Sequence, residues 1–369
     1  MDDDLSATKK NIALRVDASA QMGLGHFMRC LTLADALKER GVRTRFLSRN
    51  LPAYLEELLQ SKGHEFVVFR STGDRVVCDE LAHAGWLEST QLQDAADSAE
   101  ALSDLAWDWL VVDHYALDVR WEAAARTLAR KIMVIDDIAD RRHNANVLLD
   151  QNLYLDMQER YSGLLNADCV QLLGPQYALL RTEFFRQRKK LRLRDGAVKR
   201  ILIFFGGTDA TNETGKALEA IALLNMPQLE LDIVVGAANA HLSELNAHCG
   251  NLGNVRIHRQ VSNMAELMDA ADFGIGAAGT ATWERCALGL PALVMAVAEN
   301  QIEIAKGVDH FKAQLYLGTC ADVSAATLAS KLAVAIREPL SLQEMSSRAL
   351  TLVDALGAER LVSVLEGAA

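Results

Sequence analysis

Apolar runs that end in glycine or acidic turns recur along this chain, and helical patterns lie between them. The first half contains strand-like runs at 12–17, 42–48, 65–69, 109–113, 131–136 and 147–150, with helical patterns such as 52–62 and 121–130 between them. The second half contains further runs at 199–205, 229–235, 255–258, 273–276 and 291–297. Apolar strands that alternate with helices are typical of a parallel sheet covered on both faces. The sequence therefore predicts an α/β protein with two Rossmann-like, doubly wound halves.

The chain is long enough for two domains, because it has 369 residues and half of them are hydrophobic. We expect a first domain over 1–175, a linker over 176–198, a second domain over 199–345, and a C-terminal helix over 346–369 that can pack across to the first domain. The basic run at 186–194 is interpreted as a solvated linker helix. Two such domains would face a cleft, where the carboxyl ends of parallel strands bind ligands.

Charge and cysteine usage narrow the class of protein. The formal net charge is −11 and no basic face is evident, so we expect no nucleic acid partner. The six cysteines form no Cys-x-x-Cys pair, which favours reduced thiols over a disulfide framework or a zinc site. No apolar run is long enough to span a bilayer, and the acidic start does not resemble a signal peptide. We therefore expect a cytoplasmic protein without membrane insertion.

A glycine-rich turn, Gly23-Leu24-Gly25-His26, joins the first predicted strand to the first predicted helix. Glycine lets backbone N–H groups approach a phosphate or a sugar, because no Cβ stands in the way. Histidine is the side chain best suited to move a proton near neutral pH. The turn therefore predicts both binding and chemistry, although the same residues also fit a plain tight turn with His26 as a helix cap.

Polar side chains follow other strands of the first half. Arg15 and Asp17 end the first strand, and Asp17 is suited to orient His26 or a sugar hydroxyl. His114 and His143 are rival candidates for proton transfer, and a structural role fits both. Neighbouring aspartates at 136–137 raise the question of a metal, but no His or Glu stands at ligand spacing. We expect strand-end hydrogen bonds there, no metal and no other cofactor.

Three turns in the second half point to a nucleotide. Gly206-Gly207 is followed by hydroxyl and amide groups, namely Thr208, Thr211 and Asn212. In the turn at 276–284, Gly279 and Thr280 offer backbone bonds to a diphosphate, and Glu284 can accept both hydroxyls of a ribose. A third turn, at 298–301, carries the amides of Asn300 and Gln301. No Gly-Lys-[Ser/Thr] follows any of them, so the prediction is a diphosphate site without a P-loop. Each turn alone also fits a tight turn, a first-turn charge or an N-cap.

Many separate motifs, in one order, resemble a known family. They are Arg15-Val16-Asp17-Ala18-Ser19, Gly23-x-Gly25-His26-x-Met28-Arg29-Cys30-Leu31-Thr32-Leu33-Ala34, Asp113-His114-Tyr115, Asp136-Asp137-Ile138-Ala139-Asp140-Arg141, Leu149-Asp150-Gln151-Asn152, Gly174-Pro175-x-Tyr177-Ala178-Leu179-Leu180-Arg181-x-Glu183-Phe184, Phe205-Gly206-Gly207-Thr208-Asp209 and Glu299-Asn300-Gln301. Over about 11–301 the chain resembles the PseG family, the UDP-2,4-diacetamido-2,4,6-trideoxy-β-L-altropyranose hydrolases of pseudaminic acid synthesis. The segment 78–104 is outside the resemblance.

The resemblance implies a GT-B-like fold related to the MurG glycosyltransferases, with UDP held by the C-terminal half. It implies that His26 is the catalytic base, and that Glu284 and Asn300 hold nucleotide or sugar. With the turns described above, the expected substrate-binding residues are Arg15, Asp17, Gly23, Gly25, Arg29, Tyr115, Arg181, Gly207, Thr208, Asn212, Gly279, Thr280, Glu284, Asn300 and Gln301. UDP is a good leaving group, so the expected reaction is attack of water at C1, assisted by His26, with inversion.

Other activities fit the same residues. A glycosyltransferase of the same architecture would pass the sugar to a hydroxyl acceptor, and a UDP-sugar 2-epimerase would rearrange it. A non-catalytic sensor would bind the UDP-sugar and release nothing. Release of UDP without an acceptor separates hydrolysis from all three.

Overall fold

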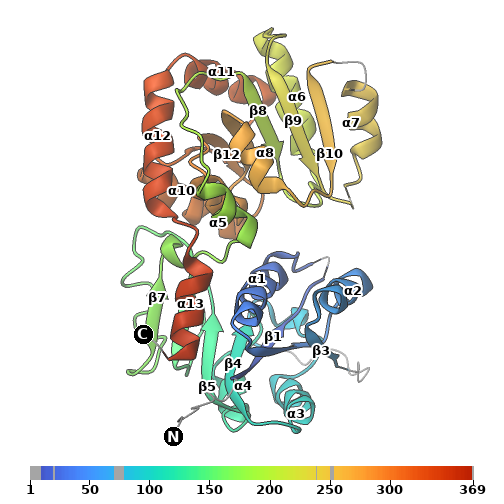
Figure 1. The fold of residues 1–369 in the computed structure, drawn as a ribbon, viewed down its shortest axis with the longest axis vertical. Coiled ribbons are helices and arrows are strands. Elements are labelled where there is room, and N and C mark those ends of the chain that lie inside the picture. The colour runs from blue at the N-terminus through green and yellow to red at the C-terminus, as the bar shows by residue number, and fades with distance from the viewer. Residues whose placement is uncertain (1–9, 20, 70–78, 238, 250–252, 368–369) are drawn as a thin grey trace, which may run out of the picture. The chain divides into compact units, whose positions relative to one another are not determined.

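A computed structural model describes residues 10–19, 21–69, 79–237, 239–249 and 253–367, which form two compact units (Figure 1). The first unit holds the described residues up to 152, then 156–179, and those from 357 onward. The second holds 153–155 and 180–356. Cys78 lies outside the described residues, and the five other cysteines are free thiols.

The first unit is built on a seven-stranded parallel sheet with the order β3-β2-β1-β4-β5-β6-β7. Its elements are β1 (Asn11–Val16), α1 (Gly25–Glu39), β2 (Arg43–Ser48), α2 (Ala53–Lys62), β3 (Glu65–Val68), the 3₁₀ turn η1 (Ala84–Trp86), α3 (Gln91–Ala101), β4 (Trp107–Asp113), α4 (Val119–Ala124), β5 (Ala129–Ile135), β6 (Val147–Asp150), β7 (Val170–Leu173), η2 (Pro175–Tyr177) and α13 (Gly357–Glu366). β1 and β4 are almost wholly buried because helices cover both faces of the sheet.

The second unit has a six-stranded parallel sheet with the order β10-β9-β8-β11-β12-β13. Its elements are α5 (Thr182–Arg188), β8 (Arg200–Phe204), α6 (Glu213–Leu224), β9 (Glu230–Val235), α7 (Leu242–Cys249), β10 (Val255–Arg259), α8 (Met264–Ala270), β11 (Phe273–Ala277), α9 (Ala281–Ala287), β12 (Ala292–Ala296), η3 (Glu299–Gln301), α10 (Ile302–His310), β13 (Leu315–Thr319), α11 (Ala325–Ile336) and α12 (Pro339–Leu352). Its core lies on β8, β9 and β11, where Ile201, Ile233 and Phe273 have no exposed surface.

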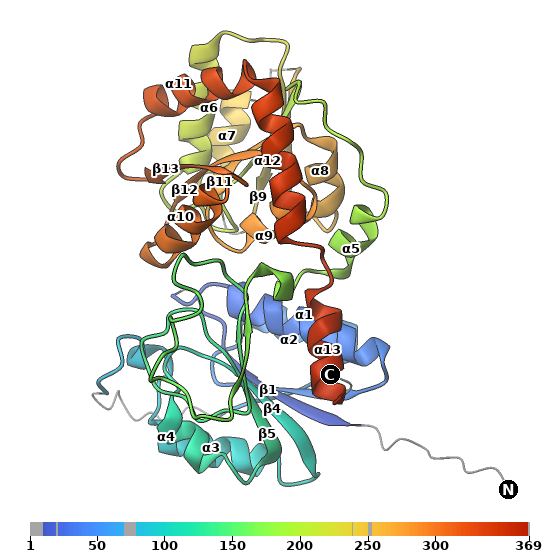
Figure 2. The same cartoon turned by 90° about the vertical axis from the view of Figure 1, so that its left-hand side faces the viewer.

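The end of the chain divides between the two units. The helix expected near the C-terminus is two helices, because the backbone leaves the helical conformation between α12 and α13, over 353–356 (Figure 2). α12 belongs to the second unit, whereas α13 belongs to the first and packs beside α1 (Figures 1 and 2). Leu361 and Leu365 of α13 are fully buried, and the Leu365 carbonyl accepts the indole N–H of Trp109 at 2.9 Å.

The basic run at 186–194 is not a solvated linker, which corrects the sequence interpretation. Only its first residues are helical, and three of its arginines bind the ends of other helices. Arg188 donates to carbonyls at 287 and 350, and Arg192 donates to three carbonyls at 269–271. Arg194 donates to carbonyls at both 268–271 and 288–289. The guanidinium groups satisfy the carbonyls that helices leave unpaired at their C-termini.

Several elements differ from the sequence expectations. The helix expected at 121–130 ends at Ala124, and β5 already begins at Ala129. The short strands β7 and β13, at the edges of their sheets, have little apolar alternation and are not among the predicted strands. In the described ranges, no helix is both long enough and apolar enough to cross a membrane.

Candidate functional site

The strand order places a ligand-binding edge in each unit. In each sheet, the second and third strands along the chain lie on one side of the first strand. The fourth strand lies on its other side. The carboxyl ends of these two adjacent strands form a topological switch point, where open α/β sheets bind ligands. In the first unit these strands are β1 and β4, and in the second unit they are β8 and β11. The predicted turns at His26, Gly206-Gly207 and Gly279-Thr280 all follow these strands.

His26 lies in the first turn of α1, beside the end of β4. The β1–β4 register pairs Val16 with Asp113, so the Asp113 carboxylate faces the turn that follows β1. Nδ1 of His26 lies 2.6 Å from Oδ1 of Asp113, and 3.1 Å from Nη2 of Arg29. Nδ1 cannot both donate to the carboxylate and accept from the guanidinium, and the shorter contact assigns the proton to Nδ1. Nε2 is then the unprotonated nitrogen, and no protein group in the described residues bonds to it.

Arg29 holds the carboxylates around the imidazole. It donates to both oxygens of Asp113, each at 2.6 Å, and through Nη1 to Asp137 at 2.8 Å. The hydroxyl of Tyr115 donates to the other oxygen of Asp137, and the Tyr115 ring meets His26 edge-on with centroids 4.5 Å apart. Burial alone would raise the pKa of Asp113, but Arg29 and His26 outweigh it and hold that pKa well below its usual range. Asp113 therefore stays ionised beside His26.

These contacts bear on two expected substrate-binding residues. The Arg29 guanidinium is engaged by Asp113 and Asp137 and is 6 % exposed, so in this structure it acts on His26 and its carboxylate partners. Tyr115 is buried with its hydroxyl on Asp137, and only its ring reaches His26. Gly23 adopts φ +75°, a conformation that favours glycine, and Gly25 is exposed at the start of α1.

Arg15 and Asp17 form part of a closed, buried network. Arg15 donates to both oxygens of Asp17 and of Asp94, and neither Arg15 nor Asp17 has exposed surface. Asp17 also accepts the backbone N–H groups of residues 49 and 50, and His114 Nε2 lies 3.2 Å from it. As described, these side chains have no surface to offer a substrate. The carboxylate that orients His26 is Asp113, and the expected role of Asp17 in orienting it is not observed.

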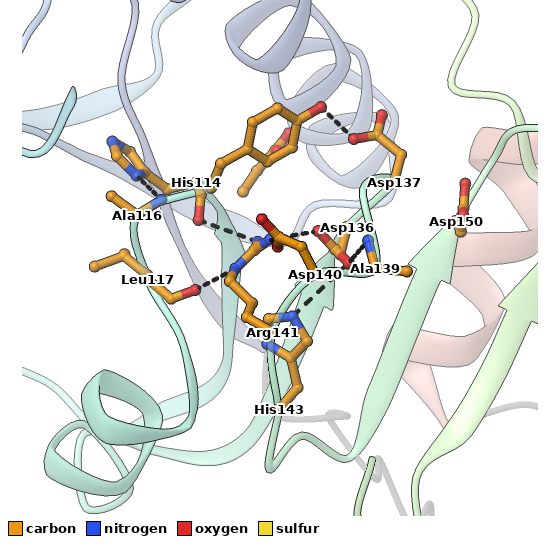
Figure 3. Close-up of polar contacts among 12 residues, drawn as sticks. His114, Ala116, Leu117, Asp136, Asp137, Ala139, Asp140, Arg141, His143 and Asp150 are labelled. Atoms are coloured by element: carbon orange, nitrogen blue, oxygen red, sulfur yellow. Dashed lines mark hydrogen bonds and ion pairs between the residues drawn. The ribbon is translucent and has the colours of Figure 1, made fainter. Parts of the chain in front are cut away.

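A second buried network fixes the loops after β4 and β5. Arg141 donates to the carbonyls of residues 114 and 117 and lies 2.9 Å from both Asp136 and Asp140 (Figure 3). Asp136 also accepts the backbone N–H of residue 139, as expected for strand-end hydrogen bonding. His143 Nδ1 lies 2.6 Å from Glu122. His114 and His143 are 1 % and 3 % exposed, so neither reaches solvent as a proton acceptor.

The second switch point has a different chemistry. After β11, the backbone N–H groups of Gly279, Thr280 and Ala281 have no hydrogen-bond acceptor among the described residues. A Cβ on Gly279 would lie 3.1 Å from Nε2 of Gln301, whose Oε1 accepts the backbone N–H of Val297 at 3.1 Å. Gln301 therefore joins the turns after β11 and β12. Asn300 is exposed beside it. Free N–H groups at the start of a helix are suited to an anion.

The turn after β8 differs from the sequence expectation. Asp209 accepts the N–H groups of Glu213 and Thr214 at 2.8 and 3.0 Å, and Asn212 Oδ1 accepts that of Gly215 at 3.1 Å. The first N–H groups of α6 are thus already capped, and Asn212 acts as the N-cap rather than as a free donor. Gly207 and Thr208 remain exposed in the preceding turn.

Glu284 and Arg181 contact each other. Nη2 of Arg181 lies 3.3 Å from Oε1 of Glu284, and Nη1 lies 2.7 Å from Glu183. Burial raises the pKa of Glu284, and Arg181 opposes that shift. The second oxygen of Glu284 is not engaged in this pair. In the described part of the chain, no cluster of three or more His, Cys, Asp or Glu side chains is arranged to hold a metal ion.

Residues 201–361 match the C-terminal domain of glycosyltransferase family 28. The uncharacterized protein MJ1062 of Methanocaldococcus jannaschii is 25 % identical over 79 % of this chain, which spans only 57 % of that relative. The spore coat polysaccharide biosynthesis protein SpsG of Bacillus subtilis is 23 % identical over 96 % of this chain and 98 % of its own. A UDP-2,4-diacetamido-2,4,6-trideoxy-β-L-altropyranose hydrolase of Campylobacter jejuni is 24 % identical over 71 % of this chain and 82 % of its own.

Solved structures show the same fold. MurG of Acinetobacter baumannii superposes with a TM-score of 0.66 at 16 % identity, covering 97 % of this chain and 99 % of its own. The glycosyltransferase of kitacinnamycin superposes with a TM-score of 0.66 at 18 % identity, covering 97 % of this chain and 98 % of its own. The chain therefore has the two-domain, Rossmann-like GT-B fold, and the predicted fold class is confirmed.

Proposed function

We propose that this protein hydrolyses a UDP-sugar, with UDP-2,4-diacetamido-2,4,6-trideoxy-β-L-altropyranose as the substrate, to free sugar and UDP. The observation that carries the proposal is the pair formed by His26 and Asp113, whose atoms lie 2.6 Å apart at a switch point. The pair leaves Nε2 of His26 able to accept a proton. The similarity to the Campylobacter jejuni hydrolase supports the choice of substrate.

The proposed reaction is a single displacement. The oxygen of a water molecule forms a bond to C1 of the sugar as the bond between C1 and the diphosphate oxygen breaks. One proton of that water passes to Nε2 of His26, and the negative charge passes to UDP. Asp113 stabilises the resulting imidazolium, since it is ionised and accepts the Nδ1 proton. Attack from the face opposite the leaving group predicts inversion at C1.

The proposed UDP site is the carboxyl edge of β8, β11 and β12. The unpaired N–H groups at 279–281 would bind the diphosphate, and Gln301 would support that turn. Glu284 would accept ribose hydroxyls through the oxygen that Arg181 does not contact. Gly207, Thr208 and Asn300 are exposed at the same edge and stay in the proposed site.

A glycosyltransferase is the second candidate. Its supporting observation is the match of residues 201–361 to a glycosyltransferase domain, together with the MurG-like fold. The two candidates share the base and the nucleotide site, and they differ in the nucleophile. No particular feature of the described residues favours an epimerase.

Hydrolysis in water enriched in ¹⁸O tests the proposal. The purified protein is incubated with a panel of UDP-diacetamido-trideoxyhexoses, without an acceptor, and followed by NMR and mass spectrometry. We expect release of UDP without label, a free sugar with one ¹⁸O at C1, and the inverted anomer formed first. A label in UDP would indicate attack on phosphorus. Absence of UDP release until a hydroxyl acceptor is added would favour the transferase.

A further inference from the structure

The segment after 78 places an aromatic surface beside His26, in a part of the chain that the family resemblance does not cover. Tyr115, which contacts His26, also meets two rings of this segment. The centroid of the His83 ring lies 5.2 Å from that of the Tyr115 ring. The Trp86 ring is stacked on Tyr115, with their centroids 5.7 Å apart and an interplanar angle of 28°. His83 and Trp86 are themselves 4.5 Å apart. Tyr115 is buried under this pair, whereas His83 and Trp86 are partly exposed.

The aromatic surface is held rigidly by the rest of the unit. Leu87, next to Trp86, is buried in the core. Gln91 accepts the backbone N–H groups of residues 118 and 121, and Asp94 binds Arg15 and the indole of Trp121. These contacts fix the start of α3, and with it the turn η1. A surface that is already ordered loses little conformational entropy when a ligand binds.

Trp86 differs from the other tryptophans of the first unit. The indole N–H groups of Trp107, Trp109 and Trp121 each donate to a protein oxygen, at 2.9–3.1 Å. The indole N–H of Trp86 has no acceptor among the described residues, and the Trp86 side chain is partly exposed. Buried tryptophans normally satisfy this donor within the protein. Because Trp86 is partly exposed, its indole N–H faces solvent and is available to a ligand that packs on the ring.

His83 adds a second unsatisfied group. Its Nδ1 is buried and has no hydrogen-bond partner among the described residues. Burial also lowers the pKa of His83, which favours the neutral imidazole. A neutral ring presents an apolar face without the desolvation cost of a charge.

We propose that His83 and Trp86 form the subsite for the sugar ring, and that this subsite selects hexoses with apolar substituents, such as a 6-deoxy methyl group and N-acetyl methyl groups. The proposal rests on the proposed function, because it places the sugar next to His26. The aromatic faces pack against the apolar face of the sugar, and the indole N–H donates to a sugar hydroxyl or acetamido oxygen. Charged or fully hydroxylated sugars would lose part of this contact.

Tryptophan fluorescence gives a direct test, because the other four tryptophans are at most 4 % exposed. The probes are UDP and a UDP-diacetamido-trideoxyhexose, titrated into the His26→Ala variant so that no turnover occurs. We expect the UDP-sugar, and not UDP, to change the emission and to protect it from acrylamide quenching. In the double variant with Trp86→Phe that signal is lost. Trp86→Ala should weaken binding of the UDP-sugar by roughly 10-fold or more, and that of UDP by less than about 2-fold.

The control is Tyr54→Ala, which removes an aromatic side chain of the same unit that is 53 % exposed and on α2. It should change neither affinity. His83→Ala is the second probe of the subsite. It should lower the affinity for the UDP-sugar by several-fold and leave the affinity for UDP unchanged. In the His26→Ala background, equal affinities for the UDP-sugar with and without Trp86→Ala, or an equal emission change with UDP alone, would overturn the subsite. If the sugar-dependent signal appears but wild-type protein releases no UDP, the subsite stands and the proposed hydrolysis fails.

Discussion

The two switch points have the same strand order and opposite chemistry. At the end of β1 and β4, charged side chains are paired with one another around His26, whose Nδ1 is engaged by Asp113 and whose Nε2 has no partner among the described residues. At the end of β8 and β11, glycines leave the edge open and backbone N–H groups remain without partners. A crowded, paired edge can hold one side chain in a fixed orientation, whereas an open edge can admit a phosphate. This difference supports the proposed division, in which the first unit transfers a proton and the second binds the nucleotide.

The sharpest test of this division is His26→Ala. Removing the base should lower kcat by roughly 10³-fold, as expected for loss of general base catalysis, while the affinity for UDP stays the same. Steady-state kinetics and calorimetry measure the two effects. His64→Ala is the matched control, because His64 also contacts a carboxylate, Asp35, at 2.8 Å in the same unit but away from the switch point. Near-normal turnover in His26→Ala would remove His26 from the mechanism.

Asp113→Asn removes the negative charge beside His26 and keeps the size and shape of the side chain. The amide can present an N–H to Nδ1 of His26 and so favour the tautomer that carries its proton on Nε2. We expect kcat to fall roughly 10²-fold with little change in KM. Loss of the charge also leaves Arg29 with Asp137 as its remaining carboxylate, at a cost of about 3 kcal/mol in the free energy of unfolding.

Urea denaturation measures the stability cost of Asp113→Asn. Asp108→Asn, at the other end of β4, is its control and should leave kcat unchanged. If both variants lost activity equally, the effect of Asp113 would be one of folding and not of imidazole orientation.

Gly207→Ala tests the open edge. A Cβ at Gly207 would meet no atom within 4 Å, and its φ is not positive, so the unfolding free energy should hardly change. If a phosphate approaches this backbone, the affinity for UDP should fall by about 10-fold, equivalent to 1.4 kcal/mol. Gly253→Ala, which also adds a Cβ to open space, should leave UDP affinity unchanged. Unaltered UDP binding in Gly207→Ala would place the nucleotide elsewhere.

The two units should also differ in how strongly acid lowers their stability, and this effect is expected to be smaller than those of the substitutions above. The pKa values of Asp17, Asp113 and Asp137 are lowered, since their cationic and hydrogen-bond partners outweigh burial. Their contribution to stability is present above the unfolded pKa of about 4 and is lost as the pH falls through the lowered folded values. Burial raises the pKa values of Glu183 and Glu284 in the second unit and of Asp150 in the first, and the contribution of these groups is instead lost as the pH rises.

The first unit should therefore be the first to open below about pH 4. Pepsin digestion at pH 3, with the fragments mapped by mass spectrometry, measures the order of opening. Earlier cleavage within 180–356 would contradict the assignment of acid sensitivity to the first unit.

Much of the fold is predictable from the chain because buried parallel strands are continuous apolar runs. The glycine turns and His26 are predictable for the same reason, since they follow those runs. The partner of His26 cannot be predicted in this way, because Asp113 is distant in sequence and contacts His26 only through the register of β1 and β4. Arg15 is expected to bind substrate but lies in a buried network with aspartates, and Arg194 is expected to be solvated but binds backbone carbonyls. A sequence shows that these side chains are charged but not which carboxylate or carbonyl the fold brings to them.

Helix α13 has a consequence for how the protein is made. The core around β1 and α1 includes Leu361 and Leu365, and these residues follow the entire second unit in the chain. During synthesis, the half that carries the imidazole is translated first, yet it stays incomplete until 357–366 leave the ribosome. The second unit, which we propose binds the nucleotide, ends at residue 356 and can reach its native state earlier. The core of the first unit is therefore completed after the second unit has been synthesised, although most of the first unit is translated before it.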